Sequence, residues 1–223
     1  MISSNSFTVY FMEIYTELER GSSAEAPLFF FVHGKAGHKD IMRIFSRGVP
    51  EGSHKIFVQA PYPDPRGGFS WWDTDLASFP ATQFTQAATA LANAITSVPL
   101  QYGIAPKTVA ALGFSQGSGI LSHLLLSKKI TLNALIVLAG FIKWPDPVPT
   151  QLNDQKIFWA HGEHDDVISI ARAQSDIAQL QNLGAQVDFI FDPVGHKIGT
   201  SGMRALKSFC SSLDDESYDA SSS

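Results

Sequence analysis

The chain has 223 residues, of which 44% are hydrophobic and 17% charged, and its net charge is -5. This length suits one domain with a continuous core, and the composition is too apolar for a disordered protein. The sequence has no cluster of Lys or Arg that would supply the positive surface required by nucleic acid or an anionic membrane. We therefore expect a folded domain that does not bind nucleic acid.

We find no targeting signal in the sequence, which has one cysteine. Residues 1–20 have no basic start followed by an apolar run, and no stretch approaches 18 apolar residues, so we expect no signal peptide and no stable membrane insertion. The single cysteine, Cys210, cannot form an internal disulfide and fits a buried position in a C-terminal helix. These features predict a cytoplasmic protein and leave a homodimer open.

Strand and helix patterns alternate along the chain. An opening edge strand or hairpin is predicted from Phe7 to Tyr15, followed by a surface loop over residues 17–26. Apolar runs typical of buried strands occupy residues 28–32, 55–59, 108–112, 133–139, 157–160 and 186–191. Helical patterns occupy residues 40–47, 82–98, 120–128, 170–183 and 203–213. Pro99 and Gly184 are expected to end two of these helices.

This alternation predicts an α/β fold in which helices cover both faces of an open, mostly parallel sheet. Neither a repeat nor a low-complexity linker divides the chain, so residues 1–213 are expected to form one domain and the acidic segment 214–223 a disordered tail. Residues 140–155 are too few for a lid domain, which predicts an open pocket without a large cap. Ligands of such sheets bind beyond the carboxyl ends of the strands.

A nucleophile motif stands at the end of one predicted strand. The run 108–112 passes into Gly-Phe-Ser-Gln-Gly at residues 113–117, and a helical pattern begins at Ile120. A sharp turn from strand to helix needs glycine on both sides of the serine and points the hydroxyl out of the sheet. Ser115 is therefore the candidate nucleophile, although Gly-x-Ser-x-Gly alone also arises by chance.

A base and an acid follow two later strands. A serine hydroxyl needs a base to take its proton, and the base needs a carboxylate to orient it. His196 follows the strand 186–191, and Asp165 follows the strand 157–160. The order Ser115, Asp165, His196 is that of the α/β-hydrolases. Asp166 is the alternative acid, because the sequence does not show which of two adjacent carboxylates faces His196.

The reaction also needs an oxyanion hole, in which amide hydrogens face the oxygen that becomes negative. One donor is expected to be the amide of Gln116, directly after the nucleophile. The other is expected in the His33-Gly34-Lys35 turn after the strand 28–32, and we assign it to Lys35.

Taken together, these motifs resemble the phospholipase/carboxylesterase family of α/β-hydrolases, which includes acyl-protein thioesterases and small carboxylesterases. The matching segments are Phe-Val-His-Gly at 31–34, Ala-Pro at 60–61, Gly-Phe-Ser-Gln-Gly at 113–117, His-Gly at 161–162 with Asp165 and Val167 after it, and Gly-His at 195–196. The resemblance implies an α/β-hydrolase with Ser115, Asp165 and His196 as its triad. The family typically has Leu-Gly where this chain has Lys35-Ala36. Because the oxyanion donor is a backbone amide, this departure affects the shape of the pocket more than the oxyanion hole.

The expected pocket wall is formed by apolar residues near the strand ends: Phe114, Trp71, Trp72, Phe141, Trp144, Ile168 and Ile198. Trp71 and Trp72 lie in a long loop rich in Pro and Gly, and they fit a core wedge equally well. The segment 161–166 is rich in His, Asp and Glu but lacks the spacing of a metal site, so neither a metal nor a cofactor is expected.

The sequence thus predicts a serine carboxylesterase that hydrolyses small-molecule esters with short to medium acyl chains through an acyl-enzyme. Two alternatives stay open. One is an acyl thioesterase or lysophospholipase with the same triad, and the other is a non-catalytic binding protein on a hydrolase fold.

Overall fold

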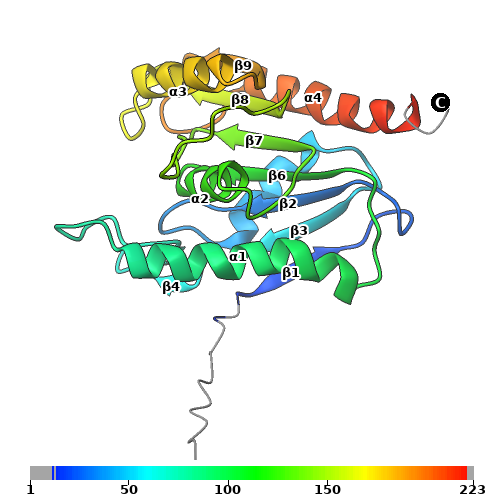
Figure 1. Cartoon of the computed structure of the whole chain (residues 1–223), viewed down its shortest axis with the longest axis horizontal. Coiled ribbons are helices and arrows are strands. Elements are labelled where there is room, and N and C mark those ends of the chain that lie inside the picture. The colour runs from blue at the N-terminus through cyan, green and yellow to red at the C-terminus, as the bar shows by residue number, and fades with distance from the viewer. Residues whose placement is uncertain (1–11, 13, 220–223) are drawn as a thin grey trace, which may run out of the picture.

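The computed structural model describes residue 12 and residues 14–219. These residues form a seven-stranded sheet in the order β1-β3-β2-β6-β7-β8-β9, in which β1 is antiparallel to β3 and the other pairs are parallel (Figure 1). The strands are β1 (Thr16–Glu19), β2 (Leu28–Val32), β3 (His54–Val58), β6 (Val109–Phe114), β7 (Ala134–Leu138), β8 (Lys156–Gly162) and β9 (Gln186–Asp192). A separate ribbon pairs β4 (Tyr62–Pro63) with β5 (Phe69–Ser70). The predicted α/β sheet is confirmed.

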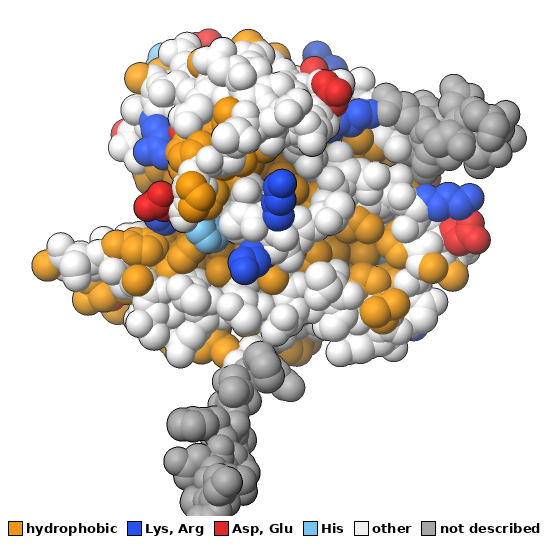
Figure 2. Space-filling model, viewed as in Figure 1, with side chains coloured by type: hydrophobic (Ala, Val, Ile, Leu, Met, Phe, Trp, Pro, Cys, Tyr) orange, Lys and Arg blue, Asp and Glu red, His pale blue; other side chains and the backbone are white. Residues whose placement is uncertain are grey.

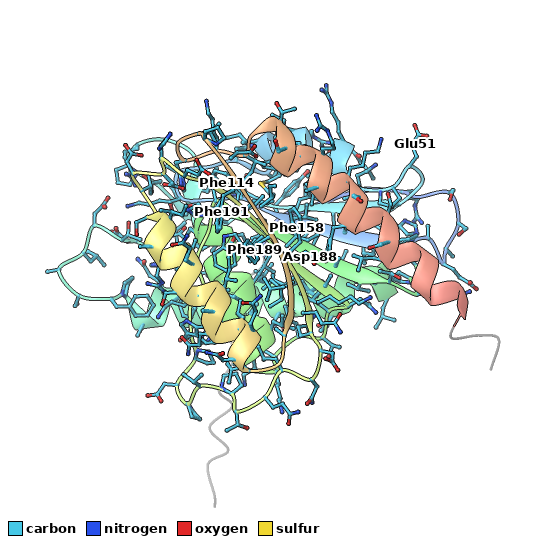
Figure 3. The ribbon with its side chains drawn as sticks, turned by 90° about the horizontal axis from the view of Figure 1, so that it is seen from above. Glu51, Phe114, Phe158, Asp188, Phe189 and Phe191 are labelled. Carbon is cyan, nitrogen blue, oxygen red and sulfur yellow. The ribbon has the colours of Figure 1, made fainter. Side chains whose placement is uncertain are left out.

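Helices cover both faces of this sheet. Residues of α1 (Ala81–Gln101), α2 (Gln116–Leu126) and α3 (Ile170–Asn182) share one core cluster. The 3₁₀ helix η1 (Lys39–Gly48) and α4 (Thr200–Asp219) contribute to a second cluster. Figure 3 shows α3 and α4 on opposite sides of β9. Among the described helices, none is long and apolar enough to cross a membrane.

Burial on both faces explains why the strands read as continuous apolar runs. Successive strand residues point to opposite faces, so Phe30 of β2 packs into the cluster under α1 and α2, whereas Phe29 and Phe31 pack into the cluster under η1 and α4. All three phenylalanines have 0% exposure. An edge strand with one exposed face would alternate apolar with polar residues instead.

Several predicted boundaries differ from the structure, among them those of the opening strand, of the helix at Pro99 and of the predicted tail. The opening edge strand is Thr16–Glu19, after the predicted range, most of which lies outside the described residues. Pro99 does not end α1, which runs to Gln101, because a proline so close to the end costs few backbone hydrogen bonds and its ring is buried. The α4 helix continues to Asp219, into the segment predicted as a tail, and residues 220–223 lie outside the described residues.

The parallel strands end at one edge of the sheet, where the arrowheads of β7 and β8 point in Figure 1. The loop between β5 and α1 projects at this same side of the molecule. Hydrophobic side chains gather on this loop in Figure 2, and Leu76 and Phe79 are 51% and 48% exposed. The turns after β2, β6, β8 and β9, which carry the predicted site residues, all lie at this edge.

Candidate active site

Ser115 occupies a strained turn between β6 and α2. Its backbone angles, φ 51° and ψ -115°, are sparsely populated for a residue with a side chain. Neighbouring backbone leaves room only for glycine on each side. A Cβ at Gly113 would lie 2.4 Å from the Ser118 nitrogen, and one at Gly117 would lie 2.2 Å from the Val32 oxygen. Tight packing of α2 against β6 and β2 therefore fixes the serine at the strand end.

His196 and Asp165 are joined by a hydrogen bond. The Nδ1 atom of His196 lies 2.7 Å from Oδ2 of Asp165, and the aspartate side chain is fully buried. A buried carboxylate at this distance favours the tautomer in which Nδ1 carries the proton and Nε2 is an acceptor. Asp166, the alternative acid, is exposed. The structure thus brings Asp165, and not Asp166, against His196.

The Asp165 carboxylate is held in its charged form by its turn. Its Oδ1 accepts hydrogen bonds from the amides of Val167 at 2.9 Å and Ile168 at 2.8 Å. Burial raises the pKa of this carboxyl, but the hydrogen bonds from Ile168, His196 and Val167 outweigh burial and lower the pKa overall. The group is therefore a stable anion beside the imidazole.

His161 fixes the same turn from within the core. Its Nε2 donates to the Ile168 carbonyl at 2.8 Å and lies 3.4 Å from Asp165 Oδ2, while Trp159 Nε1 donates to its Nδ1 at 3.4 Å. Burial lowers the pKa of His161, so the ring is neutral and serves as a structural donor. In the described part of the chain, no three His, Cys, Asp or Glu side chains converge as a metal site.

The turn after β2 packs directly against the serine. A Cβ on Gly34 would lie 3.2 Å from both the Ser115 Cβ and the Phe114 oxygen. His33 holds this turn, because its Nδ1 donates to the Gly34 carbonyl at 2.7 Å and its Nε2 accepts from the Ala60 amide at 3.0 Å. Burial lowers the pKa of His33 to about 4, which keeps the ring neutral.

Two backbone amides at this point have no partner of their own. Within the described residues, neither the Lys35 amide nor the Gln116 amide donates a hydrogen bond to another protein group. The Gln116 amide is also the first of α2, where the helix dipole favours a negative charge. One free amide directly after Ser115 and one in the turn that packs against it are donors of the kind that an oxyanion hole needs.

Ser115 and His196 line one pocket of about 350 Å³. Within the described residues, no hydrogen bond joins their side chains, as is common before substrate tightens such contacts. The remaining lining residues are His33, Gly34, Lys35, Ala36, Gly37, Ile41, Met42, Arg66, Phe114 and Val167. Phe114, labelled in Figure 3, is the one expected wall residue among them.

The other expected wall residues have different places. Trp71 and Trp72 are 0% and 4% exposed and belong to the core under α1 and α2, so they are the core wedge. Phe141 and Trp144 pack against that same core. Ile168 contributes backbone hydrogen bonds to the Asp165 turn, and Ile198 packs against the core under α4.

Gln116 has a second role that sequence reasoning missed. Its Oε1 accepts from the Trp71 amide and its Nε2 donates to the Trp72 carbonyl, both at 2.8 Å. The side chain thereby pins the loop after β5 to the start of α2. Arg66 was also missed as a pocket residue. Its only sequence signal was a place in the loop rich in Pro and Gly.

Comparison with known proteins shows the family and supports the fold. The model of the phospholipase/carboxylesterase family matches residues 15–213, and no curated protein matches the chain. A Bacillus cereus carboxylesterase has a similar structure (TM-score 0.80, 16% identity, 90% of this chain and 94% of that chain). A carboxylesterase from Mesorhizobium loti is also similar (TM-score 0.74, 21% identity, 86% of this chain and 90% of that chain). So is a phospholipase/carboxylesterase from Dyadobacter fermentans (TM-score 0.70, 16% identity, 91% of this chain and 98% of that chain).

The family match and the mostly parallel sheet define an α/β-hydrolase. More narrowly, the chain belongs to the phospholipase/carboxylesterase family, which points to an enzyme that hydrolyses ester bonds.

Proposed function

We propose that the protein is a serine carboxylesterase in which Ser115 is the nucleophile, His196 the general base and Asp165 the residue that orients His196. The observation that carries the proposal is the 2.7 Å contact of the buried Asp165 with His196, which lines the same pocket as Ser115. With Nδ1 bound to the carboxylate, Nε2 is the nitrogen left to take the serine proton.

The first half of the reaction acylates the serine. Ser115 Oγ attacks the ester carbonyl carbon as its proton passes to His196 Nε2. The carbonyl oxygen becomes an oxyanion that accepts hydrogen bonds from the amides of Lys35 and Gln116. When the tetrahedral intermediate collapses, the bond to the alcohol oxygen breaks and His196 returns the proton to that oxygen.

The second half repeats these steps with water. His196 takes a proton from water, the resulting hydroxide attacks the acyl carbon, and the same amides hold the oxyanion. Collapse breaks the bond to Ser115 Oγ, which regains its proton from His196, and the carboxylic acid leaves. Throughout, the Asp165 anion stabilises the positive charge that His196 carries while it holds the extra proton.

The pocket supports small esters as substrates. Its volume of about 350 Å³ is at the small end of ligand pockets. Ile41, Met42, Phe114 and Val167 offer apolar surface for an acyl chain. We expect kcat/KM for para-nitrophenyl esters to peak at short or medium chains, and a steady rise to long chains would contradict this preference. The cytoplasmic location predicted from the sequence belongs to the same proposal.

Covalent labelling tests the mechanism directly. A fluorophosphonate probe should label the wild-type protein and should not label Ser115→Ala. The matched control is Ser118→Ala, since Ser118 is buried in α2 and its hydroxyl is bound to the Gly113 carbonyl; this variant should still be labelled. Failure of the folded wild type to react would overturn the proposal and would favour a non-catalytic hydrolase fold.

A further inference from the structure

The pocket around Ser115 has an uneven distribution of charge. Its lining residues include two cations, Lys35 and Arg66, and among the described residues that line it none is Asp or Glu. The same lining includes the apolar residues Ile41, Phe114 and Val167. A substrate that matched both kinds of residue would carry an apolar part and an anionic group.

Arg66 is held in place by a buried carboxylate outside the pocket. Asp64 accepts hydrogen bonds from Arg66 Nε at 3.2 Å, from Nη2 at 3.5 Å and from the Arg66 amide at 3.0 Å. Its side chain is 4% exposed, whereas that of Arg66 is 56% exposed. The Arg66 guanidinium and the Ser70 hydroxyl hold the pKa of Asp64 below its usual range, so this anchor stays charged.

Anchoring through Nε and Nη2 leaves the far edge of the guanidinium available. A guanidinium has five N–H donors, and a carboxylate can bind two of them in parallel. Within the described residues, Nη1 of Arg66 makes no hydrogen bond, whereas Nη2 also forms a longer ion pair with the exposed Asp75 at 3.8 Å. The Nη1 donors are therefore available to an anion, which would replace the exposed Asp75 at Nη2.

Lys35 is less suited to this role. Its Nζ forms an ion pair with Asp75 at 2.7 Å and a hydrogen bond to Thr74, both on the loop that projects beside the pocket. Both cations are ion-paired, but the ammonium of Lys35 uses its donors on Asp75 and Thr74, whereas Nη1 of Arg66 has no partner among the described residues. Of the two cations, Arg66 is the one prepared for a ligand.

Arg66 is also connected to the turn that faces Ser115. Ser70 donates to Asp64 at 2.7 Å and accepts from the Ala36 amide at 2.9 Å. Ala36 follows Lys35, whose amide faces the reacting carbonyl in the proposed mechanism. This chain of hydrogen bonds sets the position of the guanidinium relative to the scissile bond, as a selective contact requires.

We infer that Arg66 binds a carboxylate of the substrate, so that the preferred substrates are small esters carrying a carboxylate near the ester bond. The inference rests on the proposed esterase function and deepens it. Binding of a charged group by a guanidinium with available Nη1 donors favours the charged ester over its neutral analogue by about tenfold in kcat/KM.

Matched ester pairs test this preference. One pair carries the charge in the acyl part: monomethyl glutarate against dimethyl glutarate. The other carries it in the leaving group: 4-acetoxybenzoate against its methyl ester. The ratio of kcat/KM for the charged to the neutral member is measured at pH 7.5 for the wild type, Arg66→Gln and Arg47→Gln. Arg47 is exposed on η1 and gives the same change in net charge.

In at least one pair, we expect the ratio to fall about tenfold in Arg66→Gln and to stay within twofold of wild type in Arg47→Gln. Because each ratio compares two esters on the same variant, it cancels any loss that Arg66→Gln causes to both members of a pair, and circular dichroism with fluorophosphonate labelling checks that the variant is folded. If the ratio in both pairs is the same in wild type and Arg66→Gln while neutral esters are hydrolysed, the role of Arg66 is refuted and the esterase proposal stands. A wild type that neither hydrolyses esters nor reacts with the probe would refute both.

Discussion

The two turns that flank Ser115 both begin with His-Gly, yet they use their backbone amides in opposite ways. In the turn after β2, His33 donates to the Gly34 carbonyl, and the Lys35 amide has no acceptor among the described residues. In the turn at the end of β8, His161 likewise donates to a carbonyl, but the amides of Val167 and Ile168 bind the Asp165 carboxylate.

The two turns share a buried histidine that binds the backbone, but their backbone amides interact with different negative charges. In each turn a buried, neutral imidazole fixes the backbone, and burial lowers its pKa. In the proposed mechanism, the free Lys35 amide of the first turn binds a negative charge that exists only during the reaction. The second turn stabilises a permanent charge, that of Asp165, which then acts on His196.

The largest loss of activity is expected from removing the negative charge of Asp165. Asp165→Asn should reduce kcat for a para-nitrophenyl ester by about 10³- to 10⁴-fold, because the amide cannot hold His196 in the required tautomer or stabilise its positive charge. Asp166→Asn, which changes the exposed neighbour, should stay within twofold of wild type. Equal losses in the two variants would contradict the assignment of the acid.

A smaller loss of kcat is expected from removing the free backbone N–H of Lys35. Lys35→Pro eliminates the N–H while Lys35→Ala keeps it, so the first should reduce kcat by about 10²- to 10³-fold and the second only slightly. Circular dichroism and thermal unfolding verify that both variants fold. An equal loss in the two would mean that the side chain, and not the amide, matters at this position.

The buried imidazoles should appear in the pH dependence of stability. His33 has a pKa of about 4 in the folded protein and about 6.5 when unfolded, so below pH 6.5 the unfolded chain binds the extra proton more readily. The free energy of unfolding should therefore fall by up to about 3 kcal/mol as the pH drops from 6.5 to 4. Urea unfolding at several pH values measures this slope, and His33→Gln should flatten it. An identical slope in the variant would show that other groups cause the acid sensitivity.

The sequence was sufficient for the features that depend on local pattern. The buried strands were visible because both faces are covered, as Phe29, Phe30 and Phe31 illustrate. Ser115 and His196 were recognisable as strand-end residues in hydrolase order, and the structure places both in one pocket. The family that these motifs resemble is the one to which the chain belongs.

The features that escaped prediction depend on the path of the loops. From the sequence, Trp71 and Trp72 fit a pocket wall and a core wedge equally well, and the structure places them in the core, where Gln116 binds their backbone. Arg66 reaches the pocket because its loop is folded back by the β4–β5 ribbon and a bridge between Gly37 and Phe69. Such tertiary contacts leave no periodicity in the sequence.

Gln116 has a consequence for how this protein can diverge. In the proposed mechanism its main-chain amide binds the oxyanion, while its side chain holds the loop after β5 through the backbone of Trp71 and Trp72. The side chains of that loop which pack in the core are therefore fixed by burial, and not by Gln116. Residue 66 lies in a different loop, between β4 and β5, so a lineage that exchanges it changes the charge of the pocket while the two Gln116 contacts are inherited intact.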